Sequence, residues 1–338
     1  MPAIEKISIK GFKSIASIED LALGAVNIVI GPNGSGKSNF IGVFSFLHAI
    51  REGQLQDYVT RAGGADKILH FGAKTTEKIE INVTFQEAKN RYRLSLIPTV
   101  TDEFITSDVE MAEVDRTHLD RWRIYHFHDT STNAPIKKTS DVNDNRFLRA
   151  DGANLAAFLY FLRLKHSGSY SLIRRSIQRV APFFDDFMLE PQNLNPEKIR
   201  LEWRHKESDA YFDVSSLSDG TLRFIALATL FLQPAELLPS VILVDEPELG
   251  LHPYAITMLA SLVKQASVHA QVILSTQSPQ LLDQFEPEDV LVAQRVDGGT
   301  QFTRLDAQRL GEWLDEYSLG QLWEKNEFGG RPGERISA

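Results

Sequence analysis

Residues Gly31 to Ser38 read Gly-Pro-Asn-Gly-Ser-Gly-Lys-Ser, a spacing of glycines, lysine and hydroxyl that suits the binding of a phosphate group. Glycines let successive backbone N–H groups point at one anion, and a helix that begins here adds positive potential. Lys37 would reach the β- and γ-phosphates of a nucleotide, and Ser38 would bind Mg²⁺. The pattern fixes only four positions and arises by chance in about 1% of chains of this length. A buried strand before it and an amphipathic helix after it strengthen the pattern, so we predict an ATP site made by Asn33, Gly34, Ser35, Gly36, Lys37, Ser38 and Asn39.

A second group of candidate residues lies where a short apolar run ends in carboxylates. Val241 to Val244 predicts a buried strand, and Asp245 and Glu246 follow it directly. A carboxylate at a strand tip can hold Mg²⁺ directly or through water, and its neighbour can polarise the attacking water as a general base. Acidic residues often end strands, so the pair is a weak signal alone. In a chain that also carries the phosphate loop, we predict that Asp245 binds Mg²⁺ and that Glu246 and Lys37 are catalytic.

Leu217 to Thr221 read Leu-Ser-Asp-Gly-Thr and precede a helical pattern just before the acidic strand. The plain interpretation is that Ser218 caps this helix. The order of phosphate loop, Leu-Ser-Asp-Gly-Thr and acidic strand resembles that of ABC ATPases, whose signature reads Leu-Ser-Gly-Gly-Gln or a variant. The resemblance implies that Ser218, Asp219, Gly220 and Thr221 cover the γ-phosphate of an ATP held by a second copy of the chain.

Two further segments fit this resemblance. Gly250, Leu251 and His252 resemble the D-loop, which crosses the dimer interface in ABC ATPases. Gln277 stands where the family places its switch residue, usually histidine, and the resemblance makes it a third catalytic candidate. A glutamine amide can donate a hydrogen bond but cannot become cationic, so this departure bears on the rate of hydrolysis more than on nucleotide binding. The family's Q-loop glutamine has no secure position, and Gln86 is a candidate for it and for a further Mg²⁺ contact.

Within the family, the chain resembles the heads of SMC, RecF and OLD-type proteins and stand-alone AAA-labelled ATPases. The resemblance rests on Asn39 after Gly-Lys-Ser, on the run Asp245 to His252, and on the segments Trp122–Asp129 and Asp151–Leu155. It implies a dimer closed by ATP that acts on DNA in repair, or on phage and plasmids in defence, with a separate nuclease or toxin as effector. No long heptad array precedes the signature, and the sequence after Asp245 is too short for the Toprim nuclease of OLD proteins. We therefore expect any nucleic-acid cleavage to come from a partner.

Two other functions stay open on the sequence. The chain could be the ATPase subunit of a membrane ABC transporter, which would need a coupling surface for membrane helices. It could also be an ATP-sensing scaffold with little turnover, and Gln277 keeps that alternative open.

Hydrophobic periodicity indicates the elements that must position these residues. Strands are expected near residues 7–9, 15–18, 26–30, 79–85, 92–96, 122–127 and 199–203, and helices at 39–51, 153–164 and 169–180. From residue 218 onward, helices at 221–232 and 254–266 alternate with strands at 241–244, 272–274 and 290–293, which is typical of a parallel sheet covered by helices. We predict an α/β ABC-ATPase head with a mixed N-terminal β lobe, that parallel sheet and a partly helical insert. The expected domains are an N-terminal lobe with the phosphate loop at 1–98, an insert that is irregular and then helical at 99–210, a C-terminal lobe at 211–328, and a disordered tail at 329–338.

Composition narrows the class of protein. The 338 residues are 43% hydrophobic and 24% charged, an ordinary globular balance, and the lack of cysteine excludes disulfides and thiolate metal sites. No apolar run approaches the roughly 18 residues of a membrane helix, so we expect a cytoplasmic protein with no membrane partner. The net charge of −9 argues mildly against a surface coated with nucleic acid. Arg174, Arg175 and Arg179 are still candidate nucleic-acid contacts, although a solvated helix face is the plainer interpretation.

Overall fold

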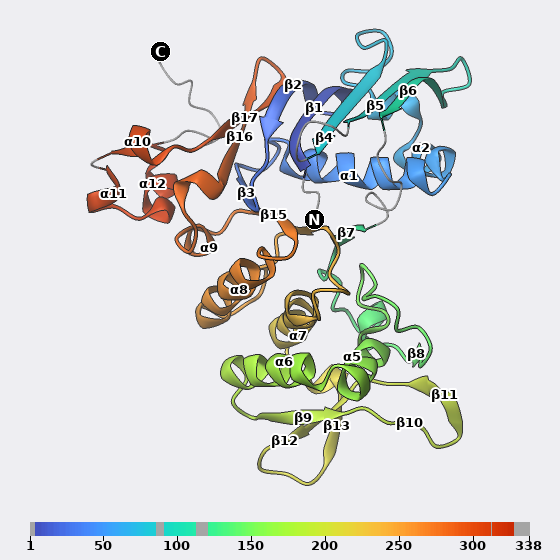
Figure 1. Ribbon diagram of the computed structural model, residues 1–338, viewed down its shortest axis with the longest axis vertical. Coiled ribbons are helices and arrows are strands. Elements are labelled where there is room, and N and C mark those ends of the chain that lie inside the picture. The colour runs from blue at the N-terminus through green and yellow to red at the C-terminus, as the bar shows by residue number, and fades with distance from the viewer. Residues whose placement is uncertain (1–3, 86–90, 113–120, 312, 328–338) are drawn as a thin grey trace. The chain divides into compact units, whose positions relative to one another are not determined.

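The computed structural model describes residues 4–85, 91–112, 121–311 and 313–327. These residues form two compact units (Figure 1). The first, here called the phosphate-loop unit, comprises Met1–Ile124, Pro239–Asp245 and Ala270–Ala338. The second, the signature unit, comprises Tyr125–Leu238 and Glu246–His269. The domain boundaries expected near residues 98 and 210 stay a prediction.

An antiparallel sheet in the order β2-β1-β4-β5-β6 forms one layer of the phosphate-loop unit. Its strands are β1 (Ile4–Phe12), β2 (Ile15–Ala22), β4 (Ile79–Phe85), β5 (Arg91–Pro98) and β6 (Phe104–Ala112). The strands expected at 79–85 and 92–96 are confirmed as β4 and β5, which pair antiparallel with Ile79 opposite Leu96. The expectation of irregular structure is wrong for β6. On this edge strand Phe104 is buried while Ile105 and Val109 are exposed, so no apolar alternation marks it in the sequence.

A mixed sheet in the order β17-β16-β3-β15-β14-β7 forms the second layer. Its strands are β3 (Val26–Ile30), β7 (Trp122–Tyr125), β14 (Val241–Asp245), β15 (Gln271–Thr276), β16 (Val290–Val296) and β17 (Gly299–Arg304). The strands β16, β3, β15 and β14 run parallel, and β17 pairs antiparallel with β16. Every residue of β3 and β15 is buried, as is usual for inner parallel strands. The carboxyl ends of β3, β14 and β15 therefore lie together at one edge of the sheet.

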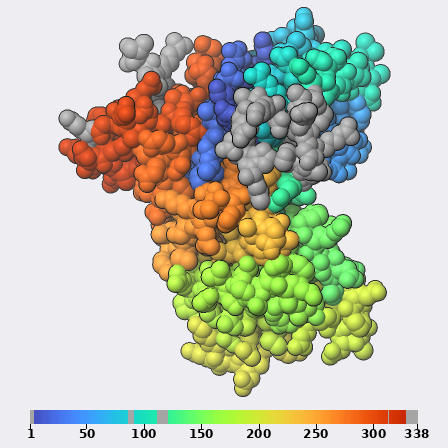
Figure 2. Space-filling view, viewed as in Figure 1, coloured from blue at the N-terminus to red at the C-terminus, as the bar shows by residue number. Residues whose placement is uncertain are grey.

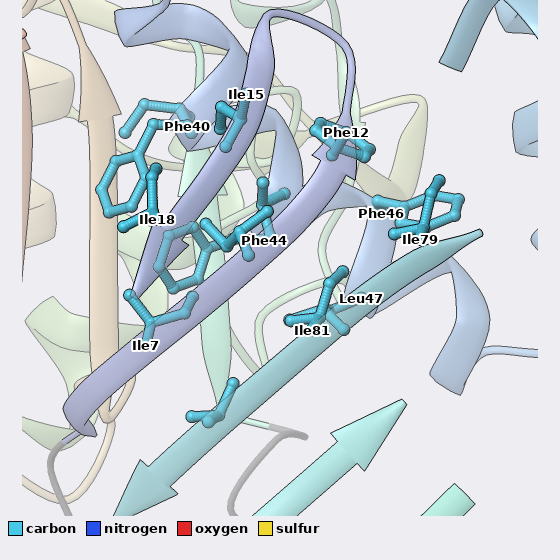
Figure 3. Close-up of a cluster of buried hydrophobic side chains, with 14 of the residues drawn as sticks. Ile7, Phe12, Ile15, Ile18, Phe40, Phe44, Phe46, Leu47, Ile79 and Ile81 are labelled. Carbon is cyan, nitrogen blue, oxygen red and sulfur yellow. The ribbon is translucent and has the colours of Figure 1, made fainter. Parts of the chain in front are cut away.

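Helix α1 (Lys37–Arg51) joins both layers into one core. Phe40, Phe44 and Phe46 on this helix are buried, and Figure 3 shows them facing side chains of β1, β2 and β4. The same cluster includes apolar residues of the mixed sheet, such as Val29 and Leu243. Each fully buried phenylalanine contributes about 1.5–3 kcal/mol relative to an exposed one, so this packing holds α1 against the two sheets.

The remaining helices of this unit are short. They are α2 (Leu55–Ala62), α3 (Ala65–Ile68), α9 (Pro279–Leu282), the 3₁₀ turn η3 (Pro287–Asp289), α10 (Ala307–Leu310), α11 (Trp313–Glu316) and α12 (Leu319–Lys325). Helix α12 packs on α9, where the Gly320 N–H donates to Asp283 Oδ1 at 2.6 Å. Across the described parts of both units, no helix is long and apolar enough to cross a membrane.

The signature unit contains four helices and two small sheets, β10-β11-β8 and β13-β12-β9. The helices are α5 (Leu155–Lys165), α6 (Ser167–Val180), α7 (Asp219–Leu232) and α8 (Pro253–Ala266), with 3₁₀ turns η1 (Pro135–Lys137) and η2 (Val214–Ser216). The strands are β8 (Ser140–Asp141), β9 (Phe184–Met188), β10 (Pro191–Gln192), β11 (Asn195–Ile199), β12 (Glu202–His205) and β13 (Tyr211–Asp213). Of the helices, α5 contacts β8 and α6 contacts β9, while α7 and α8 pack on α6 and on each other. Residues of α5 and α6 (green) form much of the surface of this unit in Figure 2.

The single strand expected at 199–203 is wrong, because β11 ends at Ile199 and β12 begins at Glu202 in a different sheet. Ile199, Leu201 and Trp203 are all buried, so their alternation continues through the break between the two strands. A chain that changes sheet while keeping its apolar side inward gives the same pattern as one strand.

The Asp151–Leu155 segment has a structural role at the start of α5. Asn154 is fully buried, and its side-chain N–H groups donate to the carbonyls of Asp144 and Phe147. Its Oδ1 accepts from the Arg149 N–H. The side chain therefore holds the preceding loop and does not cap the helix.

Candidate functional site

The phosphate loop lies between β3 and α1. Backbone conformation favours glycine at positions 34 and 36, and at Gly36 lack of space requires it as well. Gly34 and Gly36 have φ of 81° and 104°, in the left-handed region that favours glycine. A Cβ at Gly36 would lie 2.1 Å from Thr300 Oγ1 and 2.8 Å from Ser14 Oγ. No larger residue fits without movement, so the loop backbone closely approaches β17 and the turn between β1 and β2.

A hydrogen-bond network supports this loop. Ser14 Oγ accepts from Asn39 Nδ2 at 2.7 Å and from Thr300 Oγ1 at 2.8 Å. Asn39, predicted to contact ATP, therefore ties the first turn of α1 to its neighbours. Sequence patterns did not reveal Ser14 or Thr300, which are 286 positions apart.

The charges and donors around this loop suit an anion. The Lys37 side chain is buried, and its Nζ donates to the Gly31 carbonyl at 2.7 Å and to the Pro32 carbonyl at 3.2 Å. No acidic residue occupies the first turn of α1, whose N-terminus carries the positive end of the helix dipole. Ser35 Oγ is buried without a hydrogen-bond partner among the described residues. Asn33, Gly34 and Ser38 are exposed, so the loop fits a nucleotide phosphate.

Oxygen atoms suited to Mg²⁺ meet at the carboxyl ends of β3 and β14. Ser38 Oγ lies 3.5 Å from Asp245 Oδ2. The other oxygen of this carboxylate, Oδ1, accepts from Ser275 Oγ at 2.5 Å. Hydroxyl and carboxylate oxygens are the ligands that Mg²⁺ prefers, so Ser38 and Asp245 fit its chemistry. Ser275 is fully buried and was not predicted from the sequence.

The other candidates for catalysis follow the strands β14 and β15 directly in the sequence. Glu246 belongs to the signature unit and has a φ of 41°, which is uncommon for any residue other than glycine. Such conformations cluster at functional sites. Gln277 is exposed and follows β15, immediately before Ser278, which caps α9. Gln86 lies outside the described residues.

The signature segment forms the N-terminus of α7. Ser218 Oγ accepts from the Thr221 N–H at 3.1 Å, so this residue is the helix cap. Ser218 and Asp219 are exposed. A Cβ on Gly220 would lie 2.2 Å from the Gly250 carbonyl oxygen. The first turn of α7 is therefore packed directly on the D-loop segment, and only glycine fits there.

Arg223 holds three parts of the signature unit together. Its Nη1 donates to the Leu249 carbonyl at 2.7 Å, which fixes the start of the D-loop. Its Nε and Nη2 donate to the carbonyls of Phe127 at 3.1 Å and His128 at 2.7 Å. The planar guanidinium makes these bonds together, which a lysine cannot do. Arg223 was also missed in the sequence, and its contacts explain how the Trp122–Asp129 segment meets the signature helix.

After the D-loop, His252 caps α8. Its Nδ1 accepts from the Tyr254 N–H at 3.3 Å, and Pro253 is the first residue of the helix. Leu251 is half-buried and Gly250 is exposed with a φ of 75°. This loop is thus held from both ends, by Arg223 and by the cap.

The three arginines predicted to contact nucleic acid lie on α6 in different surroundings. Arg174 forms an ion pair with Asp186 at 2.8 Å. Burial raises the pKa of Tyr170, and the hydrogen bond from its hydroxyl to the same Asp186 raises that pKa further. Arg175 and Arg179 are exposed and one helical turn apart. Nucleic-acid contact by these residues stays a prediction.

A family model described as "AAA domain, putative AbiEii toxin, Type IV TA system" matches residues 26–283, which include the phosphate loop, signature segment and acidic strand. A search of the curated proteins found no match.

Solved structures of similar fold include SMC heads. One, titled as an SMC head bound to the C-winged helix domain of ScpA, is 18% identical over 91% of this chain and 99% of that chain, with a TM-score of 0.63. A second, from Pyrococcus furiosus, has an extended coiled coil and is bound to the C-terminal domain of ScpA. It is 16% identical over 94% of this chain and 99% of that chain, with a TM-score of 0.62. A third, from Thermotoga maritima, is 17% identical over 90% of this chain and 99% of that chain, with a TM-score of 0.51. Because the identities are this low, these likenesses show the fold alone. The shared fold confirms the predicted ABC-ATPase head.

Proposed function

Since the chain belongs to this AAA family and has the fold of an SMC-type ABC-ATPase head, we propose that it is an ATP-driven switch in which two copies close around ATP. Each copy holds one nucleotide on its phosphate loop and offers its signature helix to the nucleotide of the other. Binding favours the closed dimer because ATP becomes part of the interface, and hydrolysis favours opening.

Each step of hydrolysis has a residue assigned to it. Lys37 and the N-terminus of α1 hold the β- and γ-phosphates, and Ser38 and Asp245 are the residues that would hold Mg²⁺. The metal, when bound, neutralises charge on the phosphate oxygens. Glu246 takes a proton from water as the water oxygen bonds to the γ-phosphorus, and the bond from phosphorus to the bridging oxygen breaks to give ADP and phosphate. The Gln277 amide donates a hydrogen bond to the γ-phosphate.

The observation that carries this proposal is a pair of helix N-termini in different units. Helix α1 begins at the phosphate loop, and α7 begins at exposed Ser218 in the signature unit. Both ends have a glycine with no room for a side chain, Gly36 in one and Gly220 in the other. A helix N-terminus attracts anions. If two copies share their nucleotides, each chain needs one helix end for its own nucleotide and one for its partner's. This chain has both.

The closed dimer would act on another molecule. The family description names a toxin of a toxin–antitoxin system, and two of the similar SMC heads are bound to parts of ScpA. We propose that closure regulates a separate effector, such as a nuclease or toxin, in DNA repair or in defence against phage or plasmids. DNA contact by Arg175 and Arg179 on α6 belongs to the same proposal.

The test is the mass of the Glu246→Gln variant in solution, measured by light scattering during size-exclusion chromatography. With ATP and Mg²⁺ we expect the variant to double its mass, because nucleotide is bound and not hydrolysed. Lys37→Ala, which removes the phosphate contact, serves as the control and should keep its nucleotide-free mass. If the Glu246→Gln variant binds ATP but has the same mass with ATP as without ATP, the switch proposal is wrong. Turnover that stays negligible with and without duplex DNA would instead favour the sensing scaffold.

A further inference from the structure

The signature of this chain carries a negative charge where the ABC-ATPase motif has a glycine. Asp219 is the first residue of α7, and 63% of its side chain is exposed. A carboxylate at a helix N-terminus stabilises the helix through its dipole. The same carboxylate would repel a γ-phosphate that approaches this helix end.

A single lysine from another part of the signature unit meets this carboxylate. Lys137 ends the turn η1, and its Nζ lies 3.5 Å from Asp219 Oδ1. Its side chain is only 9% exposed, so the charge is held in place. Ile136 beside it is buried, which anchors the turn.

The positive charge of Lys137 also lowers the pKa of two other carboxylates, Asp129 and Asp213. Hydrogen bonds from Ser131 hold the pKa of Asp129 below its usual range, and the positive charge of Lys137 adds to this. Burial raises the pKa of Asp213, but hydrogen bonds from Ser215 and the charges of Arg200 and Lys137 leave it lowered. Asp213 has an ion pair of its own with Arg200 at 3.3 Å. Of the three carboxylates, Asp219 is the one with which Lys137 forms an ion pair.

We propose that Lys137 is a positioning residue for the ATP site shared between copies: it neutralises Asp219, so that the N-terminus of α7 can approach the γ-phosphate of the partner's ATP. This inference rests on the proposed function. An unpaired charge about 6 Å from a phosphate weakens binding by about a hundredfold at an effective dielectric constant near 20. Asp219 is exposed and solvent screens it, so we expect about a tenfold effect.

The experiment uses the Glu246→Gln variant as the background and measures the ATP concentration at which half of the protein is dimeric. Lys137→Met keeps the buried apolar stem and removes the charge. We expect it to raise that concentration about tenfold at low salt, and the defect should shrink as salt screens Asp219. Lys138→Ala is the matched control, because Lys138 is exposed and its Nζ bonds only to Asn133 among the contacts described.

A second substitution separates charge from structure. If Lys137 acts by neutralising Asp219, Asp219→Asn added to Lys137→Met should restore dimerisation to within about twofold of the background. The inference is overturned if Lys137→Met has no effect, or if the double variant stays as defective as the single one at an unchanged melting temperature. Failure of the background itself to dimerise with ATP would overturn the proposed function, and this inference with it.

Discussion

At the scale of single residues, Asp245 has both carboxylate oxygens oriented by neighbours. Ser275 donates to Oδ1, and Ser38 lies near Oδ2. The contact follows from sheet register, because Asp245 lies opposite Ser275 in the parallel pair β14–β15. A buried hydroxyl that fixes a metal-binding carboxylate belongs to the outer shell of the site, and such partners tune metal affinity.

The Ser275→Ala substitution removes this hydroxyl and with it the hydrogen bond to Asp245 Oδ1. We expect the Mg²⁺ concentration for half-maximal ATP turnover to rise about tenfold, the low end of the range for outer-shell partners. A titration of ATPase activity with Mg²⁺ measures it. Ser261→Ala, on the exposed face of α8, is the control. An unchanged Mg²⁺ midpoint in Ser275→Ala would show that the hydroxyl does not orient Asp245.

The contiguous motifs were predictable from sequence, and the residues that support them were not. Lys37, Ser38 and Asp245 stand in patterns whose spacing reflects local backbone geometry. Ser275 meets Asp245 across 30 positions, and Arg223 meets the His128 carbonyl across 95. A side chain that bonds to a distant partner leaves no periodic signal, so only the fold reveals it.

At the scale of elements, the signature helix and the D-loop behave as one packed pair. Gly220 in the first turn of α7 lies against the Gly250 carbonyl, and Arg223 one turn later binds the Leu249 carbonyl. Movement of the helix end would therefore carry the D-loop with it. The two segments that the resemblance assigns to the dimer interface are joined within one copy.

A Gly220→Ala substitution tests the contact between the signature helix and the D-loop, because helix propensity and steric fit predict effects of opposite sign. Alanine favours a helix over glycine by about 1 kcal/mol, so helix propensity alone predicts stabilisation. The added Cβ would meet a backbone carbonyl at 2.2 Å, which forces the D-loop away. In the Glu246→Gln background we expect weaker ATP-dependent dimerisation with unchanged nucleotide binding, measured by light scattering and by a fluorescent ATP analogue. Dimerisation equal to that of the background would contradict the close packing.

Elements with a regular burial pattern were predicted well, and those at edges and breaks were not. The alternation of β4 and the buried run of β3 each reflect a constant environment along the strand. Edge strand β6 has one buried residue among those whose side chains are described, so the two-residue period is absent. At the break between β11 and β12, the alternation of buried residues continues although the two strands belong to different sheets. Burial pattern therefore predicts which side of the chain faces inward, but not which partner strand it meets.

At the scale of the whole molecule, the candidate metal ligand Asp245 and the candidate base Glu246 are adjacent in sequence yet belong to different compact units. Asp245 ends β14 in the phosphate-loop unit, and Glu246 begins the return to the signature unit. The left-handed conformation of Glu246 stands at this junction.

Mixing two inactive variants tests the shared site most directly. Lys37→Ala disables the phosphate loop, and Ser218→Arg blocks the helix end offered to the partner, so each variant alone should lack ATPase activity. A mixed dimer contains one site built from the intact loop of one copy and the intact signature of the other. A mixed dimer holds one working site where the parent dimer holds two, so we predict that the equimolar mixture recovers activity that neither variant shows alone, up to about half of the parent's activity. If the equimolar mixture stays inactive while both variants are folded and Ser218→Arg still binds ATP, the nucleotide is not shared between two copies.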